Sequence, residues 1–152
     1  MKKIVIDANI ILNVWRMETD PSTGLRLYEA SASLLESILN EDVAGILLTT
    51  TAMEILHCVR VNAEMSRKSA DFAVRTAERD ISRLGLQITI PDAGIMGLAY
   101  DLFRDFHLDP YDAILVAAAV SEKADALISR DTKLKKKTAR LLPVFTPENF
   151  SV

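Results

Sequence analysis

Four carboxylates in this chain stand at positions where they could do chemistry together. They are Asp7, Glu54, Asp112 and Asp131, and each lies where an apolar run gives way to the start of an expected helix. In a parallel α/β sheet such junctions share one edge, so the four side chains should converge. Like charges that lie close together raise each other's pKa and oppose folding unless protons or a cation compensate them. The sequence therefore predicts a site for a divalent cation, Mg²⁺ or Mn²⁺.

Each of these acids also has a plain structural explanation. Asp7 and Asp131 follow expected strands and could cap the next helix by accepting backbone N–H groups. Glu54 lies three residues after Thr51, which is the capping-box spacing, and Asp112 lies in a first helical turn, where the helix dipole favours a carboxylate. Capping alone does not explain why nearly every junction at this edge carries an acid rather than Ser, Thr or Asn. The coincidence favours a shared cation.

The elements that must position these acids are visible as short apolar runs. Runs without alternation at residues 4–6, 45–48, 126–128 and 144–145, with a weaker one at 87–90, predict parallel strands covered on both faces. Helical periods lie between them, so we expect an α/β fold, a three-layer α/β/α sandwich with a mainly parallel central sheet of about five strands. The stretch from about residue 53 to 84 predicts an inserted helical hairpin, and Asp109-Pro110 predicts a helix start.

Size and composition place the chain among ordinary globular proteins. Its 152 residues are 49% hydrophobic and 26% charged, and they contain no repeat or linker, so we expect a single domain over residues 1–152. The only cysteine, Cys58, excludes an internal disulfide and a cysteine-rich zinc site, and it fits a reducing compartment.

Hydropathy and charge narrow the expected partners. The longest apolar run, residues 113–120, is far shorter than the roughly 20 residues that a membrane-spanning helix needs. The N-terminus has lysines but no cleavage site of the kind that signal peptides carry, so we expect a cytoplasmic protein with no membrane contact. The net charge of −3 gives no general attraction to nucleic acid. A polyanionic ligand would have to be held locally or through metal.

Four short motifs surround the acids. They are Ile4-Val5-Ile6-Asp7-Ala8-Asn9, the helical Glu54, Leu108-Asp109-Pro110-Tyr111-Asp112-Ala113 and Leu127-Ile128-Ser129-Arg130-Asp131. In order, spacing and total length they resemble the four motifs of the PIN-domain family, including the ribonuclease toxins of the VapC type. The resemblance covers essentially the whole chain. Each motif is short, so the specificity comes from the ordered set of four.

The resemblance implies a metal-dependent endoribonuclease that hydrolyses RNA phosphodiester bonds, of the kind found as the toxin of a toxin–antitoxin pair. It implies that Mg²⁺ or Mn²⁺ is the cofactor, that an antitoxin is a partner and that the chain forms a homodimer. Catalysis and metal binding would fall to Asp7, Glu54, Asp112 and Asp131, with Asn9 and Ser129 supporting them. The chain departs from the common pattern at Leu134, where many relatives carry an aromatic residue, and this departure bears on fine substrate preference more than on the chemistry.

Cationic side chains near the acids are candidates for contact with the RNA backbone. Arg130 and Lys133 flank Asp131, and Arg16 follows the first expected helix. A run of lysines at 135–137 and the basic side of the expected hairpin are further candidates. No base-stacking aromatic motif is evident, because the aromatic residues are dispersed. His57, one turn after Glu54, is expected to be a satisfied helical histidine.

Three other functions remain compatible with the sequence. A non-catalytic RNA- or protein-binding PIN module would keep the acids as caps. A structure-selective DNA nuclease would use the same metal chemistry, which does not itself distinguish RNA from DNA. A haloacid-dehalogenase-like phosphatase would use Asp7 as nucleophile, but that family has a second Asp two residues later, where this chain has Asn9.

Overall fold

A five-stranded parallel sheet forms the centre of the computed structural model, which describes residues 1–152. Its strands are β1 (Lys2–Ile6), β2 (Val43–Leu48), β3 (Gln87–Thr89), β4 (Ala126–Ile128) and β5 (Val144–Phe145). They are arranged in the order β3-β2-β1-β4-β5, and every neighbouring pair is parallel. The predicted α/β class and the five predicted strands are therefore confirmed.

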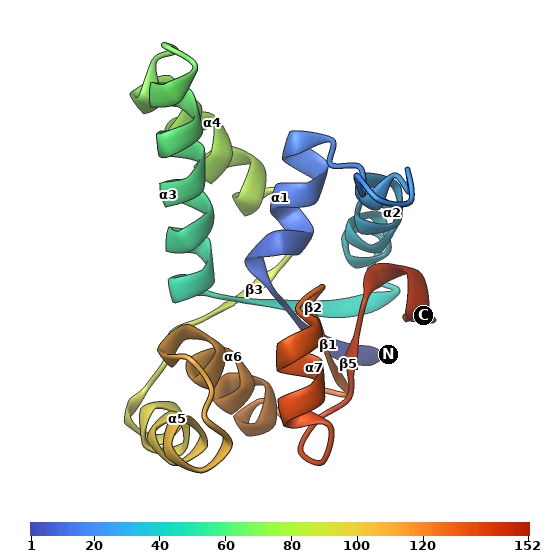
Figure 1. The fold of residues 1–152 in the computed structure, drawn as a ribbon, viewed down its shortest axis with the longest axis vertical. Helices are drawn as coiled ribbons and strands as arrows, with labels where there is room; N and C mark the ends of the chain where they lie inside the picture. The colour runs from blue at the N-terminus through green and yellow to red at the C-terminus, as the bar shows by residue number, and fades with distance from the viewer.

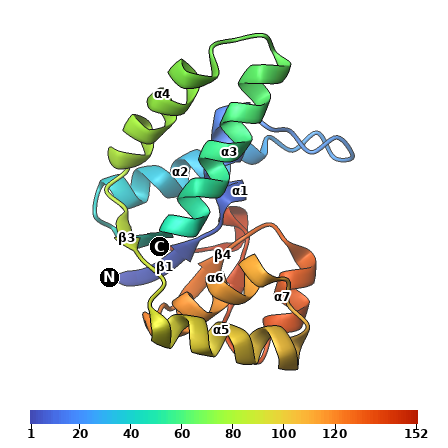
Figure 2. The same cartoon turned by 90° about the vertical axis from the view of Figure 1, so that its left-hand side faces the viewer.

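Helices cover both faces of this sheet (Figures 1 and 2). One face carries α1 (Ala8–Arg16), α2 (Leu27–Leu39), α3 (Thr49–Met65) and α4 (Ala70–Ser82). The other carries α5 (Ala93–Phe106), α6 (Pro110–Ser121) and α7 (Thr132–Thr138). A short 3-10 helix, η1 (Pro147–Asn149), follows β5. No helix combines the length and the apolar character needed to cross a membrane.

The strands are apolar at consecutive positions because both faces of the sheet are buried. Ile4 and Ile6 pack in the cluster under α1 to α4, whereas Val5 between them packs in the cluster under α5 to α7. All three are fully buried. Alternate side chains of a strand point to opposite faces, so a central strand with two covered faces needs apolar residues throughout.

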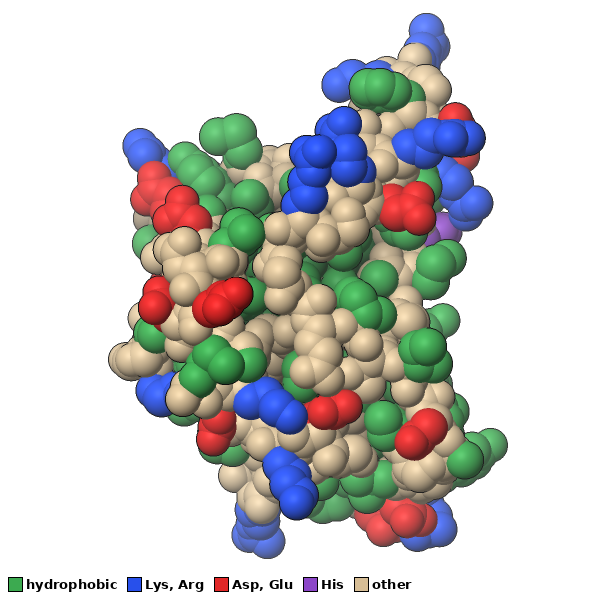
Figure 3. All heavy atoms as spheres, turned by 180° about the vertical axis from the view of Figure 1, so that it is seen from behind, with side chains coloured by type: hydrophobic (Ala, Val, Ile, Leu, Met, Phe, Trp, Pro, Cys, Tyr) green, Lys and Arg blue, Asp and Glu red, His purple; other side chains and the backbone are tan.

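The predicted helical hairpin is confirmed as α3 and α4, which project from the sheet (Figure 2). The hairpin begins at Thr49, a few residues before the predicted start, and Ser69 caps α4 by accepting a hydrogen bond from the backbone N–H of Phe72 (3.3 Å). Between residues 58 and 83 it carries six Lys and Arg against four Asp and Glu. Figure 3 shows these basic side chains gathered on the projecting arm.

The sheet order reverses at its central strand. From β1 the chain builds β2 and β3 on one side, and it then returns to place β4 and β5 on the other. The carboxyl ends of β1 and β4 are tied together where the backbone N–H of Asp7 donates to the carbonyl of Ile128 (3.0 Å). In open α/β sheets a crevice forms outside the strand ends at such a reversal. The fold therefore places the Asp7 motif where a ligand site is expected.

The α6 helix approaches the sheet closely because its buried side chains are small. Ala113, Ala117, Ala118 and Ala119 are all essentially inaccessible to solvent. Interiors are packed to the density of organic crystals, so a larger side chain here has no room. The helix that carries Asp112 is fixed in place by this packing.

We expect Ala118→Leu to lower the free energy of unfolding by about 1–3 kcal/mol, because the added methylenes overpack the interface between α6 and the sheet. Denaturant unfolding followed by circular dichroism would measure the change. Val120→Leu, at a position of the same helix that is 39% exposed, is the matched control and should leave stability unchanged. Equal effects of the two substitutions would show that α6 is not closely packed.

Candidate functional site

One cleft at the carboxyl edge of the sheet brings the predicted acids together. It has a volume of about 410 Å³, and its lining includes four acids from four elements and the asparagine of the first motif: Asp7, Glu54, Asp112, Asp131 and Asn9. It also includes Asp109, Thr50, Thr51 and Tyr111. The convergence expected from the strand-to-helix junctions is thus observed.

Asp7 lies at the end of β1, and its carboxylate is held by side chains. Both Ser129 Oγ (2.5 Å) and Asn9 Nδ2 (2.6 Å) donate to Asp7 Oδ2. The carboxylate makes no side-chain capping bond to α1, although Asp7 occupies the N-cap position. The capping explanation is therefore wrong for Asp7, and its second oxygen is left for another partner.

Asn9 and Ser129, which hold the Asp7 carboxylate, follow two different strands, β1 and β4. Ser129 is buried and also accepts a hydrogen bond from the backbone N–H of Asp131 (3.1 Å), so one hydroxyl links two of the acids. Asn9 Oδ1 is buried and has no hydrogen-bond partner. A buried acceptor without a partner costs free energy unless a water or a cation satisfies it. The amide oxygen is therefore a free ligand beside Asp7.

Glu54 extends into the cleft from the second turn of α3. The predicted capping box is wrong, because the helix begins at Thr49 with Leu48 as its N-cap, and Thr51 lies inside the first turn. Glu54 makes neither a hydrogen bond nor an ion pair within the chain. Its carboxylate is thus available to a ligand.

Asp109 and Asp112 both lie at the start of α6, but only Asp109 caps the helix. Asp109 Oδ1 accepts hydrogen bonds from the backbone N–H groups of Tyr111 (3.0 Å) and Asp112 (3.0 Å), so the predicted cap at Asp109-Pro110 is confirmed. Because Asp109 satisfies the helix start, the carboxylate of Asp112 is not needed as a cap. Asp109 also lines the cleft as a fifth acid, in addition to the four predicted from the sequence.

Asp131 keeps the capping role that was considered for it. Its Oδ1 accepts hydrogen bonds from the backbone N–H groups of Lys133 (2.7 Å) and Leu134 (3.0 Å) at the start of α7. The structure gives its other carboxylate oxygen no partner. Asp131 can therefore cap α7 with one oxygen and present the other to the cleft.

The acids raise one another's pKa values. Burial, and then the charge of Asp109, raise the pKa of Asp112 from 3.8 to about 7, with further contributions from Asp131 and Asp7. Burial and the charges of Asp7 and Asp109 raise the pKa of Glu54. Burial also raises the pKa of Asp7, although the hydrogen bonds from Ser129 and Asn9 act in the opposite direction. Each of these shifts means that the ionised form of the carboxyl group is disfavoured in the cleft.

This donor set fits a hard divalent cation. It consists of oxygen atoms only, which suits Mg²⁺ or Mn²⁺ better than zinc. No three His, Cys, Asp or Glu side chains approach closely enough in this structure to hold a metal ion. The partnerless Asn9 Oδ1 and the raised pKa of Asp112 are both compatible with a cation held among these oxygens.

Arg130, a predicted RNA contact, has a different place in the structure. Its side chain is only 15% exposed, and it pairs with Glu148 of η1 (2.7 Å). It also donates to Asn13 Oδ1 of α1 (2.6 Å) and to the carbonyl of Leu27 (2.8 Å) and Ser31 Oγ (3.2 Å) of α2. Each guanidinium nitrogen is thus engaged. Arg130 therefore joins α1, α2 and η1, and we call this set of contacts the Arg130 clamp. The side chain is engaged in these contacts instead of the predicted contact with phosphate.

The other predicted cationic contacts occupy different places. Arg16 ends α1, about 13 Å along the helix axis from Asp7, and lies within 3.6 Å of Glu18. It is therefore not brought to the cleft. Lys133 is exposed in the first turn of α7, directly after the capped start, and its ammonium has no partner. Its contact with phosphate remains a prediction.

Several residues of the cleft were not singled out from the sequence. Thr50 and Thr51 precede Glu54 on α3, and Tyr111 lies between Pro110 and Asp112 on α6. Their closeness in sequence to Glu54 and Asp112 is the feature that could have predicted their place in the cleft. Because the aromatic residues are dispersed along the sequence, nothing in their pattern indicated that Tyr111 lines the acidic cleft.

The whole chain has the same fold as several solved structures. It superposes on a toxin–antitoxin complex from Klebsiella pneumoniae with a TM-score of 0.63 at 18% identity, covering 98% of this chain and 99% of that one. For VapBC2 from Rickettsia felis, bound to a DNA fragment from its promoter, the TM-score is 0.67 at 14% identity, with 95% and 98% covered. For VapBC-1 from nontypeable Haemophilus influenzae it is 0.63 at 13% identity, with 97% and 99% covered. A comparison with curated protein sequences gave no match.

The three-layer sandwich and the acids at its carboxyl edge define an α/β protein with a site at the sheet reversal. The family model for the PIN domain matches residues 3–133, which include all four motif acids. The chain belongs to the PIN-domain family.

We expect Asp112→Asn to stabilise the protein in EDTA at pH 8 by on the order of 1 kcal/mol, a value reduced for solvent screening because the side chain is partly exposed. Between pH 3.8 and about 7 the folded state keeps the Asp112 proton that the unfolded state has released. Rising pH therefore lowers the wild-type stability through this group, and the variant lacks that loss.

Thermal unfolding from pH 4 to 8 would test the expectation. Asp42→Asn is a suitable control, because Asp42 is exposed and lies at the opposite end of β2 from the cleft. If wild type and Asp112→Asn lost stability equally over this range, the raised pKa of Asp112 would be wrong.

We expect Arg130→Gln to lower the free energy of unfolding by about 3 kcal/mol, because it leaves Glu148 unpaired in a largely buried contact. Urea unfolding at neutral pH would measure this loss. Arg16→Gln, which breaks an exposed pair, should change stability by less than about 0.5 kcal/mol. Similar losses in both variants would contradict the clamp.

Proposed function

We propose that this chain is a metal-dependent endoribonuclease. The observation that carries the proposal is the convergence of four motif acids in one cleft of a chain that belongs to the PIN-domain family. The supporting observations are the raised pKa values of Asp112 and Glu54 and the free Asn9 Oδ1. Helix capping alone does not account for Asp7, Glu54 and Asp112, because Asp109 and Asp131 are the residues that cap α6 and α7.

In this proposal the carboxylates of Asp7, Glu54, Asp112 and Asp131 hold Mg²⁺ or Mn²⁺. A bound divalent ion supplies a water of lowered pKa and offsets negative charge that develops on the phosphate. Asp7 is oriented for its role by Ser129 and Asn9, and Asp131 is oriented by its bonds to the start of α7. One of the four carboxylates accepts the proton of the attacking water.

The RNA backbone is bound by cationic side chains close to the cleft. Lys133 is the nearest candidate, because it follows Asp131 and is free of ion pairs. The α3–α4 hairpin carries further basic side chains, which Figure 3 shows on the projecting arm. Arg130 and Arg16 are not among these candidates.

Solved structures of similar fold bear on the biological role. Those from Klebsiella pneumoniae, Rickettsia felis and Haemophilus influenzae are described as a toxin–antitoxin complex or as VapBC proteins. We infer that this chain acts as the toxin of such a pair, silenced by an antitoxin, and that it forms a homodimer in the cytoplasm. Co-expression with the product of a small neighbouring gene would test this part separately from the chemistry.

We expect purified protein to cleave single-stranded and structured RNA in Mg²⁺ or Mn²⁺ and to stop in EDTA. Asp112→Asn should lose activity by more than the roughly 10- to 100-fold cost typical of residues around a metal ligand, and Ser129→Ala should fall within that range. Gel assays on a mixed panel of RNA and single-stranded DNA would measure this. Asp42→Asn should keep wild-type activity.

Each alternative predicts a different result. Cleavage of DNA but not RNA would favour the structure-selective DNA nuclease. Failure to cut any substrate, together with unchanged thermal stability in Mn²⁺, would favour a non-catalytic binding module. Cleavage that persists equally in Asp112→Asn would show that a contaminant or another site does the chemistry.

A further inference from the structure

A second hollow lies beside the acidic cleft, along the first turns of α3. It has a volume of about 500 Å³ and is lined by Thr49, Thr50, Met53, Glu54, His57 and Tyr111. Thr50, Glu54 and Tyr111 line the acidic cleft as well, so the two spaces adjoin. A ligand in the acidic cleft therefore lies beside this hollow.

Two exposed side chains give the hollow an apolar character. Met53 is 64% exposed and Tyr111 is 67% exposed, although both are large. Exposed apolar side chains gathered beside a polar cleft are typical of a contact surface. A tyrosine ring and a thioether suit a flat aromatic ligand, because the ring can stack on it and sulfur packs well against aromatic groups.

The polar groups of the hollow suit the edge of such a ligand. An Arg60 guanidinium nitrogen lies 3.2 Å from His57 Nδ1. A guanidinium can only donate, so His57 Nδ1 is the acceptor in this contact, and the other ring nitrogen, Nε2, is the one left to donate. His57 therefore offers an N–H donor, and the hydroxyls of Thr49 and Thr50 offer both donors and acceptors. Flat rings with hydrogen-bonding edges are the chemistry of nucleobases.

The hollow and the acids are fixed relative to one another. Asp109 accepts hydrogen bonds from the backbone N–H groups of both Tyr111 and Asp112. The ring that would stack on a base is thus one residue from an acid of the cleft. Glu54 and His57 are one helical turn apart on α3, which connects the same two spaces from the other side.

We propose that this hollow binds an unpaired nucleobase of the strand whose phosphate lies at the acidic cleft. The inference rests on the proposed ribonuclease function and names the form of substrate it takes. A base inside a duplex is already stacked and paired, so only a single-stranded or looped nucleotide can enter. Stacking tolerates any base, and the donor at His57 favours bases with an acceptor at the matching edge.

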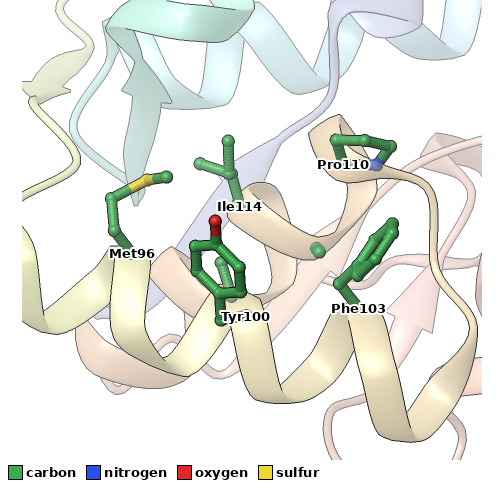
Figure 4. Close-up of a pocket in the computed structure, with 7 residues that line it drawn as sticks. Met96, Tyr100, Phe103, Pro110 and Ile114 are labelled. Carbon is green, nitrogen blue, oxygen red and sulfur yellow. The ribbon is translucent and has the colours of Figure 1, made fainter.

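Binding can be measured without cleavage by NMR of protein labelled at its five methionine methyl groups. Adenosine, cytidine, guanosine and uridine are the probes, because uncharged nucleosides are not repelled by the acids, and the buffer contains EDTA. We expect the Met53 methyl signal to shift as the ring current of the base acts on it. Met96 is the internal reference, because it lines a separate apolar pocket between α5 and α6 (Figure 4). A titration in which Met53 does not move overturns the proposal.

Tyrosine variants provide a matched comparison. Tyr111→Ala should weaken nucleoside binding by roughly 5- to 150-fold, the loss of one base–aromatic stack, and Tyr111→Phe should restore it. Tyr100 is similarly exposed, at 74%, but it lines the pocket between α5 and α6, so Tyr100→Ala should have no effect (Figure 4). Equal losses in Tyr111→Ala and Tyr100→Ala would mean nonspecific contact and overturn the proposal.

Cleavage kinetics separate this inference from the function on which it rests. In Mn²⁺, Tyr111→Ala should raise KM for single-stranded RNA more than it lowers kcat, whereas Asp112→Asn removes kcat. Cleavage without nucleoside binding would support the proposed nuclease function and reject the proposal that the hollow binds a base. Nucleoside binding without cleavage keeps the hollow and rejects the nuclease.

Discussion

The pairing of β1 with β4 is the contact on which the site depends. It places the carboxyl ends of two strands side by side, so that Ser129 donates to Asp7 across 122 positions of sequence at 2.5 Å. The backbone bond from Asp7 to Ile128 fixes the same junction. Everything else in the cleft is arranged about this seam: α1 and α7 begin there, and α3 and α6 bring their acids towards it.

Once the seam exists, charge governs the site. Four or five carboxylates at one edge cost free energy, and the elevated pKa values of Asp7, Glu54 and Asp112 record that cost. The rest of the molecule is closely packed, because the sheet is buried on both faces and α6 packs through its alanines. This is the usual relation between a rigid scaffold and a destabilised functional edge.

The fold and the acids could be predicted because both depend on local patterns. Unbroken apolar runs identify buried parallel strands, and the acids that follow several of these runs identify a ligand edge. Arg130 could not be placed correctly, since its neighbour Asp131 faces the cleft while its own side chain turns to α2 and η1, and only three-dimensional packing decides that direction. Tyr111 was overlooked for a similar reason, because a single exposed tyrosine gains meaning only when α3 comes to lie beside it.

The clamp at Arg130 bears on the order in which the molecule takes shape during synthesis. A growing chain emerges N-terminus first, and its early segments begin to fold before the later ones exist. Here β1 cannot pair with β4 until residues 126–128 have been synthesised, and Arg130 cannot pair with Glu148 until later still. The contacts of the acidic edge therefore require nearly the whole chain. A nascent chain therefore carries Asp7 for most of its synthesis without Ser129, which donates to its carboxylate in the finished fold.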